Sequence, residues 1–278
     1  MFCLLLLLIQ TASTFEPALT LERQDHWLVI RGKYLPGGSI KINYLEAYCR
    51  AGSTDADWGK HTVIAHRSVM LTRKPDGTQI ELRDTLADGL VVHHLITAGT
   101  DEICFIWKAK NPTSKASEAH WAQPCVRLGT FTGFRNELTG NLEDYLPKCF
   151  IFLDGKLTRM PTHDWAKQAR YTPGQVWKGP LAPATDVNPR PLSKLVPSHG
   201  LIGCFSADDK VIFAMAAEPY QELFQGVARC LHFDFRLGGL LPGEEKTVRG
   251  KIYLVKNDVP ALVKRYENDF PEHRQPSK

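Results

Sequence analysis

The sequence lacks the short motifs that assign a reaction class directly. Its 278 residues contain no phosphate-binding loop, dinucleotide fingerprint, nucleophile elbow, HExxH helix or EF-hand loop. The usual signatures of nucleotide, zinc-peptidase, α/β-hydrolase and calcium chemistry are therefore missing, and we expect no cofactor. Neither a CxxC pair nor a Cys/His zinc spacing occurs, so we expect no structural metal site.

Runs of like charge and long apolar runs are also scarce. The chain has 34 Lys and Arg residues against 30 Asp and Glu, and no basic run is interleaved with aromatic residues. We therefore expect no nucleic-acid partner. No apolar run approaches the ~20 residues that cross a bilayer, so we expect no transmembrane anchor. With 43% apolar and 23% charged residues, the composition is that of a globular protein.

The beginning of the sequence carries an export signal. Residues 2–9 are apolar and are followed by small or polar residues, although a positively charged start is missing. We interpret residues 1–14 as a signal peptide, residues 15–278 as a single β-sandwich domain, and the protein as secreted or periplasmic. A domain of this size needs few covalent links. We expect one disulfide or none among the six remaining cysteines, Cys49, Cys104, Cys125, Cys149, Cys204 and Cys230.

The pattern that the sequence does contain is that of strands. Short runs rich in β-branched and aromatic residues, such as residues 26–32 and 78–86, are bounded by turn residues such as Asp154 and Gly155. Strands that are joined by tight turns are antiparallel. We therefore predict an all-β fold, a large antiparallel β-sandwich with a short C-terminal helix.

Two segments depart from the strand pattern. In the predicted C-terminal helix, Asp258 is the capping residue and Pro260 lies in the first turn. Residues 161–200 hold seven prolines and show neither a strand period nor a helix period. We interpret them as a lid or binding loop, on which His163 and Trp165 are positioned for contact with a ligand.

One predicted strand, residues 228–237, carries an alternating row of reactive side chains. An extended chain places alternate residues on opposite faces, so Cys230, His232, Asp234 and Arg236 share one face and apolar residues share the other. A histidine with a carboxylate is the minimum for proton transfer near neutral pH. A solvated strand face, or a metal site formed by Cys230, His232 and Asp234, would show the same pattern.

Two further predicted strands carry similar rows. One row consists of Tyr44, Glu46, Tyr48 and Arg50, and the other of Trp121, Gln123, Cys125 and Arg127. Flat rings and planar hydrogen-bonding groups suit a sugar, but the same composition suits a contact with another protein. Because Pro124 lacks an N–H group, its strand is expected to lie at a sheet edge or to contain a bulge.

Residues 219–226 come directly before the reactive row. We interpret them as its approach loop, from which Glu222 reaches the polar face of the following strand. A glutamate beside a histidine is an acid/base couple for proton abstraction or glycosidic chemistry.

The order of elements resembles the galactose-mutarotase-like superfamily, whose members share a large antiparallel supersandwich. Residues 90–125 look like two paired strands, a turn, and a strand that bears a histidine beside an aromatic residue, in "AHW" at 119–121. Residues 238–258 look like the Pro-Gly-Glu turn and the closing strand of such sandwiches. The sequence also resembles secreted bacterial proteins of unassigned function, for which the superfamily supplies a fold without a chemistry.

The resemblance implies a substrate on the concave sheet face, a histidine as acid and a carboxylate as base. The positions that match are His120 or His232 for the acid, and Glu222 or Asp234 for the base. The chain departs from the epimerases in its shortness, in its proline-rich insertion and in the residues around their catalytic glutamate. The resemblance therefore does not single out epimerase activity.

We predict from these patterns a secreted protein that handles carbohydrate by acid/base catalysis. His232 and Glu222 would transfer protons, Asp234 would orient His232, and His120 is the second candidate acid. The residues predicted to hold the sugar are Trp121, Tyr48, Arg135, Glu46, His163 and Trp165. Hydrolase, lyase and epimerase stay open, and the alternative is a non-catalytic module that binds a glycan or another component of the cell envelope.

Overall fold

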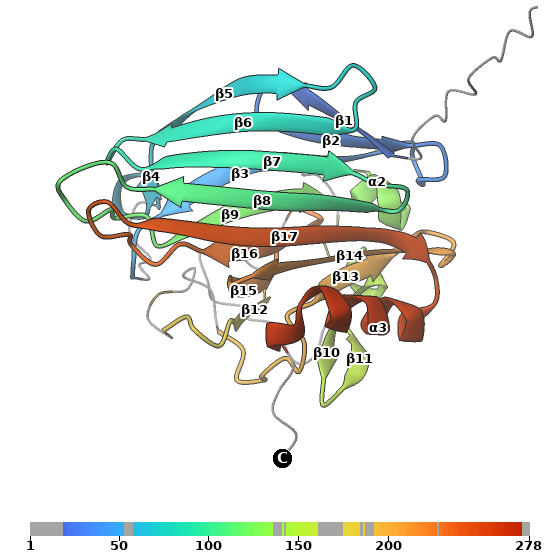
Figure 1. Ribbon diagram of the computed structural model, residues 1–278. Coiled ribbons are helices and arrows are strands. Elements are labelled where there is room, and N and C mark those ends of the chain that lie inside the picture. Colours follow the sequence, from blue (N-terminus) through green and yellow to red (C-terminus); the bar gives the residue numbers. More distant parts are fainter. Residues whose placement is uncertain are drawn as a thin grey trace, which may run out of the picture.

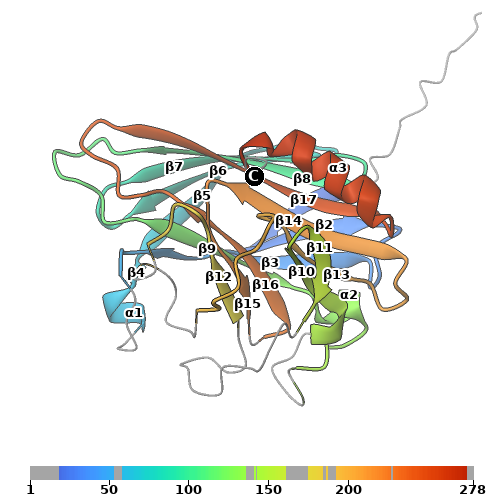
Figure 2. The same ribbon diagram turned by 90° about the horizontal axis from the view of Figure 1, so that it is seen from below.

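The computed structural model (Figure 1) describes residues 19–52, 58–135, 141, 143–160, 175–183, 186, 192–226 and 228–273. In this part of the chain, two β-sheets lie face to face (Figure 2), and their named strands pair antiparallel. The predicted all-β antiparallel sandwich is therefore confirmed. The predicted signal peptide and the residues His163 and Trp165 lie outside the described residues.

The first sheet, which we call sheet A, has eight strands. In order across the sheet they are β1 (Leu19–Gln24), β2 (Trp27–Gly32), β3 (Ser39–Cys49), β9 (Trp121–Arg127), β16 (Cys230–Arg236), β15 (Tyr220–Gln225) and β12 (Gln175–Lys178), with β4 (Val63–Ile64) paired to β3. Two expectations were wrong here. The segment 161–200 contains a strand, β12, and the segment that carries Glu222 is strand β15 rather than an approach loop.

The second sheet, sheet B, has nine strands. In order they are β11 (Lys156–Arg159), β10 (Cys149–Leu153), β13 (Ile202–Phe205), β14 (Val211–Glu218), β17 (Glu245–Lys256), β8 (Glu102–Lys110), β7 (Val91–Ala98), β6 (Gln79–Leu86) and β5 (His66–Arg73). Asp154 and Gly155 join β10 to β11 and both have positive φ, at 50° and 73°. Asp and Gly tolerate this two-residue turn, which explains why the dipeptide predicts the hairpin.

Short helices complete the described part of the chain. They are α1 (Trp58–His61), α2 (Gly129–Thr132), α3 (Val259–Asp269), and the 3₁₀ turns η1 (Leu146–Lys148) and η2 (Pro271–His273). The C-terminal helix α3 is confirmed, because the Asp258 side chain accepts a hydrogen bond from the N–H of Ala261 at 3.0 Å. Leu262 and Tyr266 pack this helix on the face of sheet B that is turned away from sheet A. None of the described helices is long and apolar enough to span a bilayer.

The main core fills the space between the two sheets. The apolar row of β16, represented by Leu231, Phe233 and Phe235, is completely buried there and packs against Phe105 and Trp107 of sheet B. The prediction that alternate residues of this strand face in opposite directions is therefore confirmed. It follows that the reactive row points to the other side of sheet A.

The pairing of β3 with β9 contains an irregularity that alters which side chains share a face. Asn43 pairs with Cys125 and Ala47 with Gln123, so residues 44–46 stand opposite Pro124 alone. Strand β9 lies in the middle of sheet A, so the bulge alternative for Pro124 is confirmed and the edge alternative is wrong.

This bulge overturns the predicted row of aromatic residues on β3. Tyr48 points into the main core, where its hydroxyl donates to Asp84 Oδ2 at 2.8 Å, whereas Glu46 is exposed on the opposite side of the sheet. Tyr48 is completely buried beside Tyr44 and His94. The prediction that Tyr48 and Glu46 contact one sugar is therefore wrong, because two-residue alternation does not hold across a bulge.

Candidate functional site

Polar side chains gather on the side of sheet A that is turned away from sheet B, which we call the outer face. Leu223 of β15 and the apolar row of β16 enter the core, so the residues that alternate with them point to the outer face. Phe224 is among these, and its ring packs on His232 with centroids 4.4 Å apart. On the three strands β9, β16 and β15, the reactive members of the outer face are Trp121, Gln123, Cys125, Arg127, Cys230, His232, Asp234, Arg236 and Glu222.

The middle of the outer face is buried, unlike a solvated strand face. Glu222 and Asp234 have no exposed surface, and His232 is 2% exposed. Glu222 and Asp234 are direct partners across β15 and β16, so their side chains are neighbours. Burying carboxylates is costly, and proteins concentrate such groups at functional sites. The interpretation of the reactive row as a solvated surface is therefore wrong.

Several carboxylates of this face act on the buried thiol of Cys49. Its burial is the main reason why the pKa of Cys49 lies well above its usual value. Negative charge on Asp234, Glu222, Glu46 and Asp186 raises that pKa further. Four carboxylates from separate parts of the chain are therefore near enough to act on this thiol.

His232 lies between a thiol and a carboxylate. Its Nε2 is 3.4 Å from Cys230 Sγ, and its Nδ1 is 3.6 Å from Asp234 Oδ1, which is too long for a hydrogen bond. Burial favours the neutral ring, but the sulfur of Cys230 and the carboxylate of Asp234 raise the pKa of His232 to about 9. Both ring nitrogens thus face protein atoms.

Cys230 also contacts a second thiol. A hydrogen bond from Cys125, with His232 and Arg127 nearby, lowers the pKa of Cys230 well below its usual value although burial acts in the opposite direction. The sulfur atoms of Cys125 and Cys230 and one ring nitrogen of His232 all lie within 4.8 Å of one another. These three buried residues form the one group among the described residues whose donor atoms are close enough to hold a metal ion.

Arg236 organises one end of the outer face. Its Nη1 donates to Asp186 Oδ2 at 2.9 Å and to Gln221 Oε1 at 2.7 Å. His120 Nδ1 lies 3.6 Å from the same Asp186 oxygen. Burial opposes ionisation of Asp186, but His120 and Arg236 lower its pKa below the usual value. The side chain of His120 is 28% exposed, so this end is where the outer face reaches solvent.

A second hydrogen-bonded array lies nearer the middle of the outer face. Glu46 accepts from Gln123 Nε2 and from Asn43 Nδ2, each at 3.1 Å. The adjacent Trp121 is completely buried and packs against Trp58 with ring centroids 6.1 Å apart. Its indole Nε1 is buried without a hydrogen-bond acceptor among the described residues. The outer face therefore presents planar donors and acceptors in fixed positions beside an aromatic ring.

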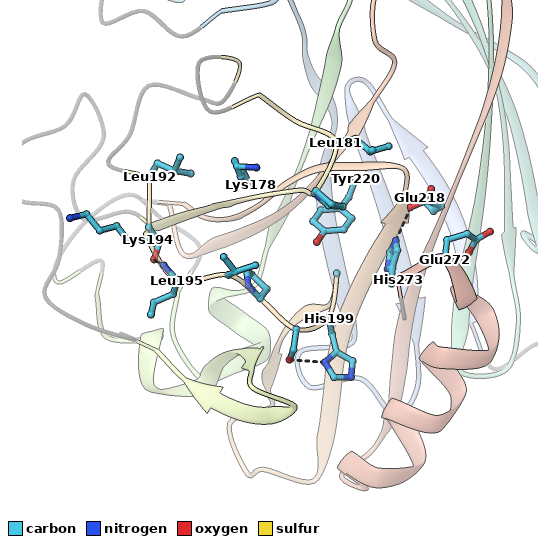
Figure 3. Close-up of a pocket in the computed structure, with 16 residues that line it drawn as sticks. Lys178, Leu181, Leu192, Lys194, Leu195, His199, Glu218, Tyr220, Glu272 and His273 are labelled. Carbon is cyan, nitrogen blue, oxygen red and sulfur yellow. Dashed lines mark hydrogen bonds and ion pairs between the residues drawn. The ribbon is translucent and has the colours of Figure 1, made fainter. Parts of the chain in front are cut away.

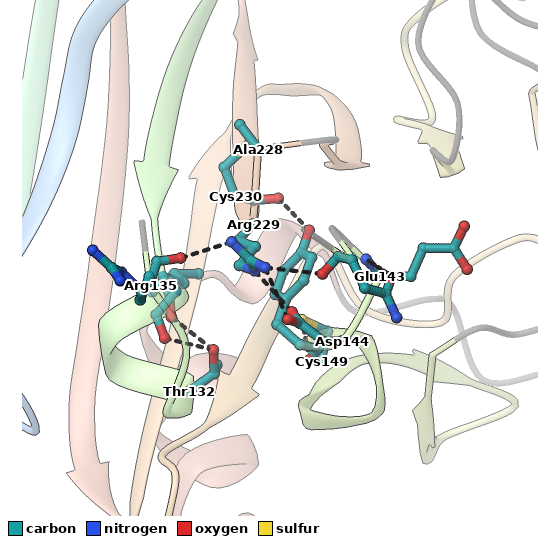
Figure 4. A network of polar contacts seen from close by, with 12 residues as sticks. Thr132, Arg135, Glu143, Asp144, Cys149, Ala228, Arg229 and Cys230 are labelled. Carbon is teal, nitrogen blue, oxygen red and sulfur yellow. Dashed lines mark hydrogen bonds and ion pairs between the residues drawn. The ribbon is translucent and has the colours of Figure 1, made fainter. Parts of the chain in front are cut away.

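A buried network fixes the entry to β16, directly beside the thiol pair (Figure 4). The guanidinium of Arg229 forms two 2.8 Å bonds with the Asp144 carboxylate and a 2.9 Å bond with the carbonyl of Arg135. The hydroxyl of Tyr145 lies 2.8 Å from the carbonyl of Gly226 and 2.9 Å from that of Cys230. These contacts hold the backbone at Cys230 in one conformation.

The structure gathers some predicted site residues and separates others. Those that lie on the outer face or at its rim are His232, Glu222, Asp234, Trp121, Glu46 and His120. Arg135 is exposed in the loop after α2, and its carbonyl contacts Arg229 (Figure 4). The prediction that Arg135 holds a sugar beside Trp121 is not supported by this placement, and Tyr48 belongs to the core.

Sequence reasoning missed two residues of the site. Cys125 was placed in a polar row but given no role, because its contact with Cys230 depends on the pairing of β9 with β16, about 100 positions apart. An alternating Cys-x-His in one strand and a cysteine in another was the available signal. For Asp186, which stands between Pro183 and Pro189 in the sequence, no sequence signal was available.

A cavity of about 740 Å³ lies near the end of β12 and is lined by other residues (Figure 3). Leu181 and Val196, which are 64% and 74% exposed, belong to its wall. At one end, His273 Nε2 is 2.8 Å from Glu218 Oε2. None of the predicted site residues lines this cavity, so it is separate from the reactive groups of the outer face.

Comparison with known proteins finds solved structures of similar fold. No protein-family model and no curated protein matches the chain. A galactose mutarotase-like protein from Lactobacillus casei ATCC 334 is 7% identical at a TM-score of 0.43, with 85% of this chain and 100% of that chain covered. A candidate aldose 1-epimerase from Escherichia coli K12 is 9% identical at 0.43, with 86% and 99% covered.

A larger enzyme matches over part of its length. The GH36 α-galactosidase AgaA from Geobacillus stearothermophilus is 9% identical at a TM-score of 0.39, with 86% of this chain and 40% of that chain covered. The likeness to these structures is one of overall fold alone, and the resemblance to the galactose-mutarotase-like superfamily stays a prediction. At these scores and identities it carries no information about substrate or reaction.

Proposed function

We propose that the protein binds carbohydrate on the outer face of sheet A and transfers protons to and from it. Glu222 is the base and His120 is the acid in this proposal. It is carried by one observation: a completely buried carboxylate shares a sheet face with two hydrogen-bonded polar arrays and with an imidazole that reaches solvent.

The two arrays suit sugar hydroxyls. Arg236 with Asp186 and Gln221 forms one array, and Glu46 with Gln123 and Asn43 forms the other. Hydroxyl groups donate and accept, so they pair with fixed carboxylate, amide and guanidinium groups. The names of the solved structures with a similar fold agree with a carbohydrate ligand, but the proposal depends on the chemistry of this face.

His232 has a different role from the one that the sequence pattern favours. Its two ring nitrogens face Cys230 and Asp234, so neither points toward a bound substrate. His120 is the partly exposed imidazole, and it stands at the end of the face where a sugar enters. We therefore assign the acid to the second of the two histidines that the resemblance matches.

Export from the cytoplasm is part of the same proposal. It is supported by the apolar residues 2–9 and by the small and polar residues that follow them. Comparing the mass of the purified extracellular or periplasmic protein with the full sequence tests it. Cleavage near residue 14 is the expected result, and recovery of the intact chain from the cytoplasm would contradict it.

Paired substitutions test the acid/base assignment. Purified Glu222→Gln and His120→Asn variants are assayed on free aldoses by polarimetry, on aryl glycosides, and on uronic acid polymers. We expect turnover to fall by about 10²–10⁴-fold for whichever substrate the wild type accepts, because each variant removes a proton-transfer group. Glu218→Gln is the matched control, since Glu218 is a carboxylate paired with His273 away from the outer face. Full activity in Glu222→Gln would overturn the assignment.

A non-catalytic carbohydrate-binding module is the second candidate. The observation that favours it is the complete burial of Glu222 and Asp234, which places the carboxylates out of reach of solvent. Binding of a glycan by the wild type and by Glu222→Gln, with no turnover of any substrate in the panel, would support the module over the enzyme.

A further inference from the structure

We propose that Cys125, Cys230 and His232 bind one soft divalent cation, with zinc as the preferred ion. Two thiols and an imidazole converge there with all donor atoms within 4.8 Å of one another, and the three residues are at most 3% exposed. Thiolate and imidazole are the ligands that zinc selects in proteins. The site goes beyond the proposed carbohydrate function and does not depend on it.

The spacing of the donor atoms fits a tetrahedral ion. Zinc bonds of about 2.3 Å to sulfur and 2.0–2.1 Å to nitrogen separate the two ligand atoms by about 3.5 Å at a tetrahedral angle. Cys230 Sγ and His232 Nε2 are 3.4 Å apart. Little movement of either side chain is therefore needed to admit the ion between them.

The three ligands stand on two adjacent strands of one sheet. Cys125 is the cross-strand partner of His232 in β9 and β16, and Cys230 lies two residues before His232 on the same face. The backbone at Gly226 packs directly against them, because a Cβ at that position would lie 2.4 Å from Cys230 Sγ and 3.2 Å from His232 Nε2. A larger residue there would displace the sulfur.

The surroundings support the ligands in the way that metal sites require. Asp234 lies 3.6 Å from the His232 nitrogen that faces away from Cys230, and a carboxylate behind a ligating histidine fixes the ring and makes it a stronger ligand. Tyr145 and Arg229 hold the backbone at Cys230. The three ligands leave one tetrahedral position for water or for an oxygen of a substrate.

Metal binding by the whole protein tests the proposal. The wild type is purified under reducing conditions without chelator, its zinc content is measured, and the stripped protein is titrated with Co²⁺. We expect one ion per chain and an intense thiolate-to-cobalt absorption band. Cys230→Ser and Cys125→Ser should lose the band and bind Zn²⁺ at least about 10-fold more weakly, and Asp234→Asn should bind about 10–100-fold more weakly. Cys49→Ala, a buried thiol of the same face, is the control that should bind normally.

A labelling measurement on the wild type covers the case in which a variant does not fold. Zn²⁺ should slow alkylation of Cys125 and Cys230, mapped by mass spectrometry, and leave the rates at the other four cysteines of residues 15–278 unchanged. Absence of both the cobalt band and this protection would overturn the proposal. So would a disulfide between Cys125 and Cys230 whose reduction restores no metal binding.

Discussion

The two faces of sheet A each carry a buried polar cluster, and the clusters differ in how their members are paired. On the inner face, the hydroxyl of Tyr44 accepts from Trp107 Nε1 at 2.8 Å and meets His94 Nδ1 at 2.9 Å. Asp84 joins the opposite side of the same histidine at 3.2 Å and accepts from Tyr48. The inner cluster is a chain of short contacts between the two sheets.

On the outer face, the groups around His232 lie farther apart and include two thiols. The nearest carboxylate oxygen is 3.6 Å from His232 Nδ1, and Trp121 Nε1 has no acceptor among the described residues. Two carboxylates, Glu222 and Asp234, are neighbours there. Burying two neighbouring carboxylates is costly, and proteins accept such a cost where function requires it. The comparison teaches that burial alone does not separate structural polar groups from functional ones, because both clusters are buried.

The largest effect is expected from breaking the inner cluster. Asp84→Ala leaves His94 and Tyr48 buried without their common partner, and the free energy of unfolding should fall by about 3–5 kcal/mol. Urea unfolding followed by tryptophan fluorescence measures it. Asp88→Ala, at a turn on the same sheet, is expected to cost less. A loss below that of the control would show that the inner cluster contributes little.

The next effect concerns the network that anchors the outer cluster. Arg229→Ala removes both bonds to Asp144 and should lower the free energy of unfolding by about 3 kcal/mol. Because the network holds Cys230, the same variant should also react faster with a thiol reagent under native conditions. An unchanged reaction rate in a folded Arg229→Ala variant would argue against this anchoring role.

The next prediction concerns the pH dependence of stability, to which the inner cluster contributes through the titration of Asp84. Burial alone would raise its pKa, but contacts with His94, Ser68 and Tyr48 lower it to about 2 from the ordinary 3.8. A carboxyl group whose pKa is lower in the folded state adds its full stabilisation to the free energy of unfolding above pH 4. This stabilisation is lost as the pH falls from 4 to 2. The loss should be about 2 kcal/mol, and Asp84→Asn should remove that part of the pH dependence. An unchanged acid profile in the variant would contradict it.

The smallest expected effect is the difference in stability between substitutions of two buried tryptophans. Trp107→Phe and Trp121→Phe remove the same atoms, but only the Trp107 indole donates a hydrogen bond within the described part of the chain, to Tyr44. Trp107→Phe should therefore destabilise the protein by about 1 kcal/mol more than Trp121→Phe. Equal losses in denaturant unfolding would show that the indole of Trp121 is as fully paired as that of Trp107.

Local patterns predicted what strand geometry alone determines. Alternation in β16 correctly placed Leu231, Phe233 and Phe235 in the core and the reactive row on the other side. Alternation failed for Tyr48, because a bulge opposite Pro124 changes the count of residues between the two faces. The proline signalled an irregularity, but its partner strand was needed to show where the faces change.

Contacts between strands that are distant along the chain could not be predicted from the sequence. Glu222 was expected near His232, yet its place directly opposite Asp234 depends on the register of β15 and β16. Cys125 meets Cys230 only because β9 pairs with β16. Register is set by the fit of the whole sheet on its core, which no single segment specifies.

The central claim is that the buried carboxylates of the outer face serve a ligand, whereas Asp84 of the inner face serves stability. Side-by-side urea unfolding of Glu222→Gln and Asp84→Asn, which are equivalent changes from carboxylate to amide, tests it most directly. We expect Glu222→Gln to change the free energy of unfolding little, because a buried carboxylate that serves a ligand is not kept for stability, and Asp84→Asn to lower it by about 2 kcal/mol. Equal losses in the two variants would contradict the account.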